Sequence, residues 1–156
     1  MIIMPVERFK RTPTVTAGAY SANDVVGGRL QFTGCTGGTL QSITICDNAA
    51  QTGDYLLVFF ESAPTDITDN AAFDIADADL AKIIYQTTLA SATQRQAFSD
   101  NAYYYVYNLD VPLKGTGGDI YAFLIALGTP TYAATSDITV TIQVETKGAR
   151  AGLSAY

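Results

Sequence analysis

The feature that most constrains the fold is a series of short strand-like runs separated by glycine, proline and asparagine. The run at Ile138–Glu145 alternates Ile and Val with Thr, Gln and Glu, so an extended strand there has one apolar and one polar face. Residues 54–61 are apolar on both faces, which predicts a central strand covered on both sides. No alternation of strand-like with helix-like runs occurs, so the sheet is expected to be antiparallel.

The runs predict about eight strands and very little helix. The expected strands are residues 14–16, 28–34, 40–47, 54–61, 83–89, 102–111, 119–127 and 138–145. One short helix is expected near Asp77–Lys82, where acidic residues precede a helix-favouring interior. We therefore predict an all-β fold, an antiparallel two-sheet sandwich of jelly-roll type. An immunoglobulin-like sandwich is the alternative, although its core tryptophan is missing from this chain.

A hairpin is expected in the first half of the chain, about the paired glycines Gly37 and Gly38. Joining the two flanking strands there sets Phe32 opposite Ile43, and the apolar faces of both strands then agree. The same register places Cys35 and Cys46 several residues apart along the ladder, beyond the ~7 Å between Cα atoms that a disulfide spans. Both cysteines are predicted to be free thiols.

A segment rich in small residues precedes this hairpin and surrounds Tyr20. Gly27 and Gly28 follow two valines there, and a strand rather than a helix comes next. The two glycines are therefore expected to form a bulge or to allow a close backbone approach, not to bind phosphate. Tyr20 is expected to pack at the end of the sandwich.

Charge divides the chain into an acidic body and two basic ends. Residues 12–146 hold four basic and fourteen acidic residues, whereas residues 1–11 hold three basic and one acidic residue. The expected organisation is an N-terminal arm at 1–11, a sandwich domain at 12–147 and a C-terminal tail at 148–156. Because phosphate contacts supply most of the affinity for nucleic acid, the acidic body argues against nucleic acid as a partner.

The residue types argue against an enzyme. The chain has no histidine, which removes the commonest general base and the commonest metal ligand. The acidic cluster of Asp69, Asp74, Asp77 and Asp79 lacks the glycine and the alternate spacing of a calcium loop. The glycine-rich residues 114–118 lead into a strand, whereas a phosphate loop leads into a helix. We expect no catalytic residue, no metal and no cofactor.

Membrane association is not expected. The longest apolar run, residues 120–127, is too short to cross a bilayer. The start of the chain is apolar only up to Met4, so no signal peptide is expected and the protein should be made in a cytoplasm.

Four tyrosines, Tyr103, Tyr104, Tyr105 and Tyr107, could form a platform for sugar stacking. Alternation places three of the four on one side of a strand, so core and inter-subunit packing is the favoured use.

The chain ends are the candidate protein interface, because large apolar residues rarely remain exposed without a partner. The candidate interface residues are Ile2, Ile3, Val6, Arg8, Phe9, Lys10, Arg11, Lys147, Arg150 and Tyr156.

Two stretches resemble a known group of proteins. The run PTVTAGAYSANDVVGG at 13–28 resembles the start of small β-rich structural proteins of tailed bacteriophages, and TDNAAFDIADADLAK at 68–82 is similar to the same proteins. Some of those proteins look like capsid decoration, or cement, proteins. The resemblance implies a non-enzymatic virion structural protein on the outer surface of the capsid, which binds and stabilises the lattice of the major capsid protein.

The same reading implies a homo-oligomer, with a trimer favoured because symmetric lattices commonly carry trimers at threefold positions. The alternative is a carbohydrate- or receptor-binding β-sandwich module of a phage tail or fibre.

Overall fold

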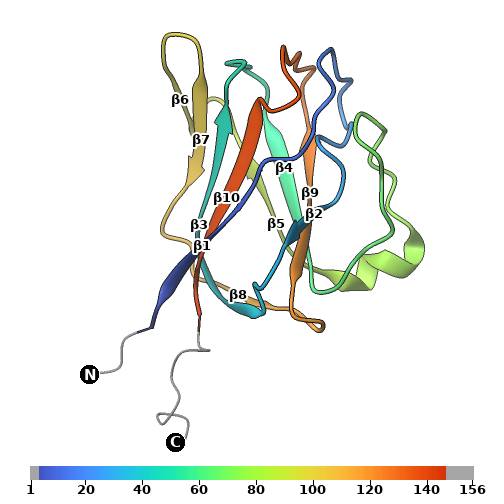
Figure 1. Cartoon of the computed structure of the whole chain (residues 1–156), viewed down its shortest axis with the longest axis vertical. Coiled ribbons are helices and arrows are strands. Elements are labelled where there is room, and N and C mark those ends of the chain that lie inside the picture. The colour runs from blue at the N-terminus through green and yellow to red at the C-terminus, as the bar shows by residue number, and fades with distance from the viewer. Residues whose placement is uncertain (1–3, 147–156) are drawn as a thin grey trace, which may run out of the picture.

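The computed structural model describes residues 4–146, which form two packed antiparallel sheets (Figure 1). The elements are β1 (Val6–Arg11), β2 (Leu30–Phe32), β3 (Gly37–Asp47), β4 (Tyr55–Phe60), η1 (Asp77–Lys82), β5 (Ile83–Leu89), β6 (Arg95–Ala97), β7 (Ala102–Val106), β8 (Val111–Lys114), β9 (Ile120–Ala126) and β10 (Ile138–Glu145). The short helix expected at Asp77–Lys82 is a 3₁₀ helix.

The strand order is that of a jelly roll. The first sheet runs β1-β10-β3-β7-β6, and the second runs β2-β9-β4-β5. β8 also pairs with β3, directly beyond the part of β3 that pairs with β7, so β7 and β8 together fill one strand position. Apart from the three-residue β6 at the far edge of the first sheet, each sheet then has four strand positions, and these interleave along the chain as in a jelly roll. The predicted all-β sandwich is confirmed.

Two hydrophobic clusters hold the sandwich together. The larger lies between the sheets and includes Leu57 and Phe59 of β4. The smaller lies on the outer side of the second sheet, where Val58 and Phe60 of β4 pack under the long β4–β5 connection. The prediction that β4 is a central strand covered on both faces is therefore confirmed. The outer face of the first sheet has no such cover within residues 4–146, and we call it the open face.

The predicted hairpin about Gly37 and Gly38 is wrong. β2 lies in the second sheet and pairs with β9, setting Phe32 opposite Ile120, whereas β3 lies in the first sheet. Ile43 of β3 pairs with Ile142 of β10. The two runs have compatible apolar faces because both line the same core, not because they pair with each other.

Gly37 and Gly38 begin β3 instead of forming a turn. Their φ angles are 135° and 142°. A Cβ on Gly37 would lie 2.6 Å from the Leu113 carbonyl oxygen, and one on Gly38 would lie 2.2 Å from the Glu145 carbonyl oxygen. The glycines therefore allow β8, β3 and β10 to pack closely at this end of the sheet.

The N-terminal segment also departs from expectation. Val6–Arg11, expected to belong to an arm without regular structure, forms β1 and pairs along its whole length with β10. Only Phe9 of this strand is half-buried, against the main core, and the other five side chains are exposed. An edge strand with one covered residue shows no alternation in its sequence, which is why the pattern missed it. Residues 14–16, expected as a strand, are irregular.

The predicted strand at residues 102–111 is interrupted. β7 ends at Val106, Asn108 takes a positive φ of 57°, and β8 begins at Val111. Pro112 lies within β8 rather than ending the strand, and it pairs with Thr39 of β3. β8 has only β3 as a ladder partner among the described residues, so a residue without an N–H is tolerated there.

Both cysteines are free, as predicted. Cys35 is buried and Cys46 is exposed on β3. Burial raises the pKa of the Cys35 thiol to about 11.

Candidate functional site

The segment around Tyr20 is organised by one carboxylate. Asp69 accepts hydrogen bonds of 2.6 Å from the Thr16 hydroxyl, the Tyr20 hydroxyl and the Gly27 amide. Burial, reinforced by the hydrogen bond to Asp69, raises the pKa of Tyr20. The Tyr20 ring, expected to pack at the end of the sandwich, is buried in the main core and meets Tyr132 edge-on at 5.3 Å. Asp69 thus ties the N-terminal segment to the β4–β5 connection and serves the fold.

Gly27 confirms the close approach expected there. Its φ is +83°, and a Cβ at this position would lie 2.4 Å from Cβ of Pro13. The Gly27 amide is at the same time the donor to Asp69. The glycine is needed because the chain passes the proline ring at this distance.

The acidic residues of the β4–β5 connection also have structural partners. Asp79 accepts hydrogen bonds from the Lys82 ammonium at 2.6 Å and from the Thr65 amide at 2.8 Å. The Lys82 ammonium, helped by that amide, lowers the pKa of Asp79 to about 2. Within residues 4–146, no three Cys, Asp or Glu side chains gather closely enough to hold a metal ion.

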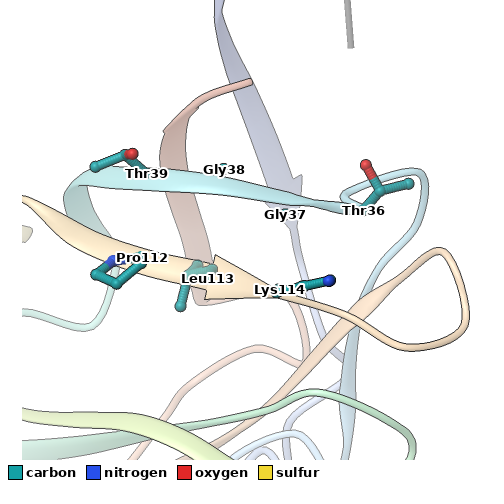
Figure 2. Close-up of a pocket in the computed structure, with 7 residues that line it drawn as sticks. All are labelled: Thr36, Gly37, Gly38, Thr39, Pro112, Leu113 and Lys114. Atoms are coloured by element: carbon teal, nitrogen blue, oxygen red, sulfur yellow. The ribbon is translucent and has the colours of Figure 1, made fainter. Parts of the chain in front are cut away.

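A hollow of about 430 Å³ lies where β3 and β8 pair (Figure 2). Figure 2 shows Thr36 and Lys114 at one end and Thr39 and Pro112 at the other, with the bare Gly37–Gly38 backbone between them. Lys114 is the one charged residue in its lining. The hollow exists because two glycines leave space, and it brings no set of reactive side chains together.

The open face is where polar and aromatic side chains gather. Tyr103, Tyr105 and Tyr107 stack along it with ring centroids 6.1 and 5.1 Å apart, and Tyr107 is 52% exposed. Tyr104 points the other way and is buried edge-on against Tyr55 at 5.1 Å. The expected core role therefore holds for Tyr104, whereas the other three tyrosines lie on the surface of the first sheet.

β1 carries the described part of the predicted interface. Val6, Arg8, Phe9, Lys10 and Arg11 all lie on this strand, and β1 is the terminal strand of the first sheet. The other candidates lie outside the described residues; they are Ile2, Ile3, Lys147, Arg150 and Tyr156.

The pairing of β1 with β10 sets Arg8 opposite Gln143 and Lys10 opposite Thr141, on the open face. Sequence reasoning selected the basic residues but missed that they form a sheet edge. The closely spaced basic residues could have indicated a sheet edge, since charged residues are typical of protected edge strands.

No protein-family model matches the chain, and no curated protein sequence matches it significantly. No helix within residues 4–146 is long and apolar enough to cross a membrane.

Proposed function

We propose that the protein is a non-enzymatic virion structural protein: a capsid decoration, or cement, protein that binds the major capsid protein lattice from outside. The observation that carries this proposal is β1, a six-residue edge strand with three basic residues on an otherwise acidic body. The resemblance of residues 13–28 and 68–82 to phage structural proteins supports the same function.

An edge strand presents backbone N–H and C=O groups to which a partner strand can be added. Arg8, Lys10 and Arg11 favour an acidic partner strand, and they disfavour pairing of β1 with a second β1, since like charges would face each other. An acidic strand of the major capsid protein is therefore the proposed partner. Copies of the protein are proposed to form trimers at threefold positions of the lattice.

The test compares two single charge reversals on capsids of the virus that encodes the chain. Lys10→Glu reverses a charge on β1, and Lys114→Glu makes the same change at an exposed position of β8. We expect Lys10→Glu to weaken binding about tenfold or more, because a like charge then faces the acidic partner. Lys114→Glu should bind as the unmodified protein does.

The readout is the number of copies per capsid after co-sedimentation over a range of protein concentrations. If Lys10→Glu binds capsids as tightly as Lys114→Glu does, β1 is not the interface. Absence of the unmodified protein from separated heads, with its presence in separated tails, would instead favour the tail or fibre module.

A further inference from the structure

The open face contains a polar hollow of about 180 Å³ between β1 and β7. Strand register builds it, because Arg8 pairs with Gln143 and Gln143 pairs with Ser42 across three strands. In the next row, Thr141 pairs with Thr44. Tyr103 and Tyr107 line it from the β7 side, and their hydroxyls lie 3.0 Å apart.

The floor of this hollow is formed by buried hydroxyl groups. Thr141, Ser42 and Thr44 are only 5%, 7% and 8% exposed. The Ser42 hydroxyl donates to the Gln143 side-chain oxygen at 3.0 Å. No side chain within residues 4–146 forms a hydrogen bond with the Thr141 hydroxyl, although this residue lines the hollow. Because buried polar groups are generally hydrogen-bonded, this hydroxyl is available to a polar ligand group that enters the hollow.

Arg8 is the one charged residue that lines the hollow. The single salt bridge within residues 4–146 joins Lys82 to Asp79, so the Arg8 guanidinium forms no ion pair with a described carboxylate. The planar guanidinium offers two parallel N–H donors that match a carboxylate. The charge of the hollow therefore favours an anionic ligand with that geometry.

A second hollow, of about 450 Å³, continues past Tyr107 and shares Ser42 and Gln143 with the first. Tyr107 is half exposed between them, so its ring is available for contact with the apolar face of a ligand. The lining suits a molecule with several hydroxyl groups, an apolar face and one carboxylate. Its hydroxyl and amide groups match the ligand hydroxyls, the arginine matches the carboxylate, and the aromatic ring matches the apolar face.

We propose that this hollow binds an acidic sugar, a sialic acid or hexuronic acid unit of a glycan. Arg8 pairs with the sugar carboxylate, the Ser42 and Thr141 hydroxyls bind ring hydroxyls, and Tyr107 contacts the neighbouring sugar. The site goes beyond capsid decoration, because it would attach the protein to glycans through the face of the first sheet.

In the experiment, the full-length protein is titrated with matched ligands, and chemical-shift changes in its NMR spectra measure binding. The probes are sialyllactose against lactose, glucuronic acid against glucose, and acetate as a bare carboxylate. At least one acidic sugar should bind saturably and about tenfold or more tightly than its neutral counterpart and than acetate, since a charge-assisted pair and several hydroxyl contacts are made together.

Three variants locate the site. Arg8→Gln should weaken binding of the acidic sugar about tenfold. Arg11→Gln makes the same charge change on the opposite side of β1, and its affinity for the sugar should stay within about twofold of that of the unmodified protein. Thr141→Val keeps the side-chain shape on β10, and it should weaken binding about fivefold or more without lowering the unfolding temperature.

Each of three results would overturn the proposal. They are the absence of saturable binding by the unmodified protein, equal losses in Arg8→Gln and Arg11→Gln, and acetate binding as tightly as the acidic sugars. The last result would identify a plain carboxylate site, suited to an acidic side chain of a second protein.

Discussion

Gly27 passes the ring of Pro13 with no room for a side chain. Replacing it with alanine would place a Cβ 2.4 Å from Pro13 in a backbone conformation with a φ of +83°. We expect Gly27→Ala to lower the free energy of unfolding by about 2 kcal/mol or more, since it combines backbone strain with a steric clash. Urea unfolding followed by circular dichroism measures this change.

Gly117→Ala is the matched control, because a Cβ at Gly117 meets nothing within 4 Å. The free energy of unfolding of Gly117→Ala should stay within about 0.5 kcal/mol of that of the unmodified protein. Equal effects of the two substitutions would show that the contact with Pro13 is unimportant for stability.

The two glycine pairs also show where prediction from single residues ends. Gly27 and Gly28, like Gly37 and Gly38, signal an unusual backbone, and at Gly27 the expected close approach is correct. At Gly37 and Gly38 the same dipeptide predicted a turn, whereas these two glycines are the first residues of β3. The local sequence shows that a side chain is missing, whereas the neighbour that requires its absence comes from a distant part of the chain.

Among the elements, η1 makes stability depend on acid pH. The pKa of Asp79 is lowered to about 2 by the Lys82 ammonium and the Thr65 amide, below the ~3.9 of an unfolded aspartate. The stabilisation from Asp79 is therefore fully present above about pH 4 and is lost as the pH falls toward 2.

Asp79→Asn should consequently reduce stability most above pH 4, and the difference from the unmodified protein should shrink as the pH approaches 2. Urea unfolding at several pH values measures both proteins. Asp77→Asn, an exposed change in the same 3₁₀ helix, serves as the control. A difference that stays constant down to pH 2 would contradict the role of Asp79.

Central and edge strands differ in how well their sequences reveal them. β4 was predictable because both of its faces are buried, one in each hydrophobic cluster. β1 was not predictable, because only Phe9 meets the core and β10 supplies its pairing. The break between β7 and β8 at Asn108 was also missed, since apolar residues continue on either side of it.

For the whole molecule, unbalanced charge should make stability depend on salt. Residues 12–146 contain fourteen acidic and four basic residues, and one salt bridge joins a pair of them. Raising NaCl from 0.01 to 0.15 M shortens the screening length from about 30 to about 8 Å, which weakens repulsion within the acidic body. The urea midpoint should therefore rise with salt.

The control is a double variant, Asp74→Asn with Asp77→Asn, which removes two exposed negative charges. Its midpoint should rise less over the same salt range. A midpoint that falls with salt in the unmodified protein would show that attraction between charges outweighs repulsion.

The fold class followed from the sequence, whereas the strand order and the hollow on the open face did not. Strand-like runs and the lack of helical ones indicate a sandwich, but pairing partners lie far apart in the chain. Arg8, Ser42 and Thr141 come from three strands, and only their register brings them together. The sequence did identify Arg8 as a candidate interface residue, from its charge near the end of the chain.

The position of β10 between β1 and β3 affects the order of events during synthesis (Figure 1). β1 is made early, but β10, its ladder partner, must leave the ribosome before β1 can pair with it. One side of β3 waits for the same strand, whereas its other side pairs with β7 and β8, which are made earlier. The first sheet therefore cannot close while the chain is still growing through residue 145. Until β10 pairs, β1 and one edge of β3 stay unpaired, so this interval is when the first sheet is most exposed to misassembly and to chaperone binding.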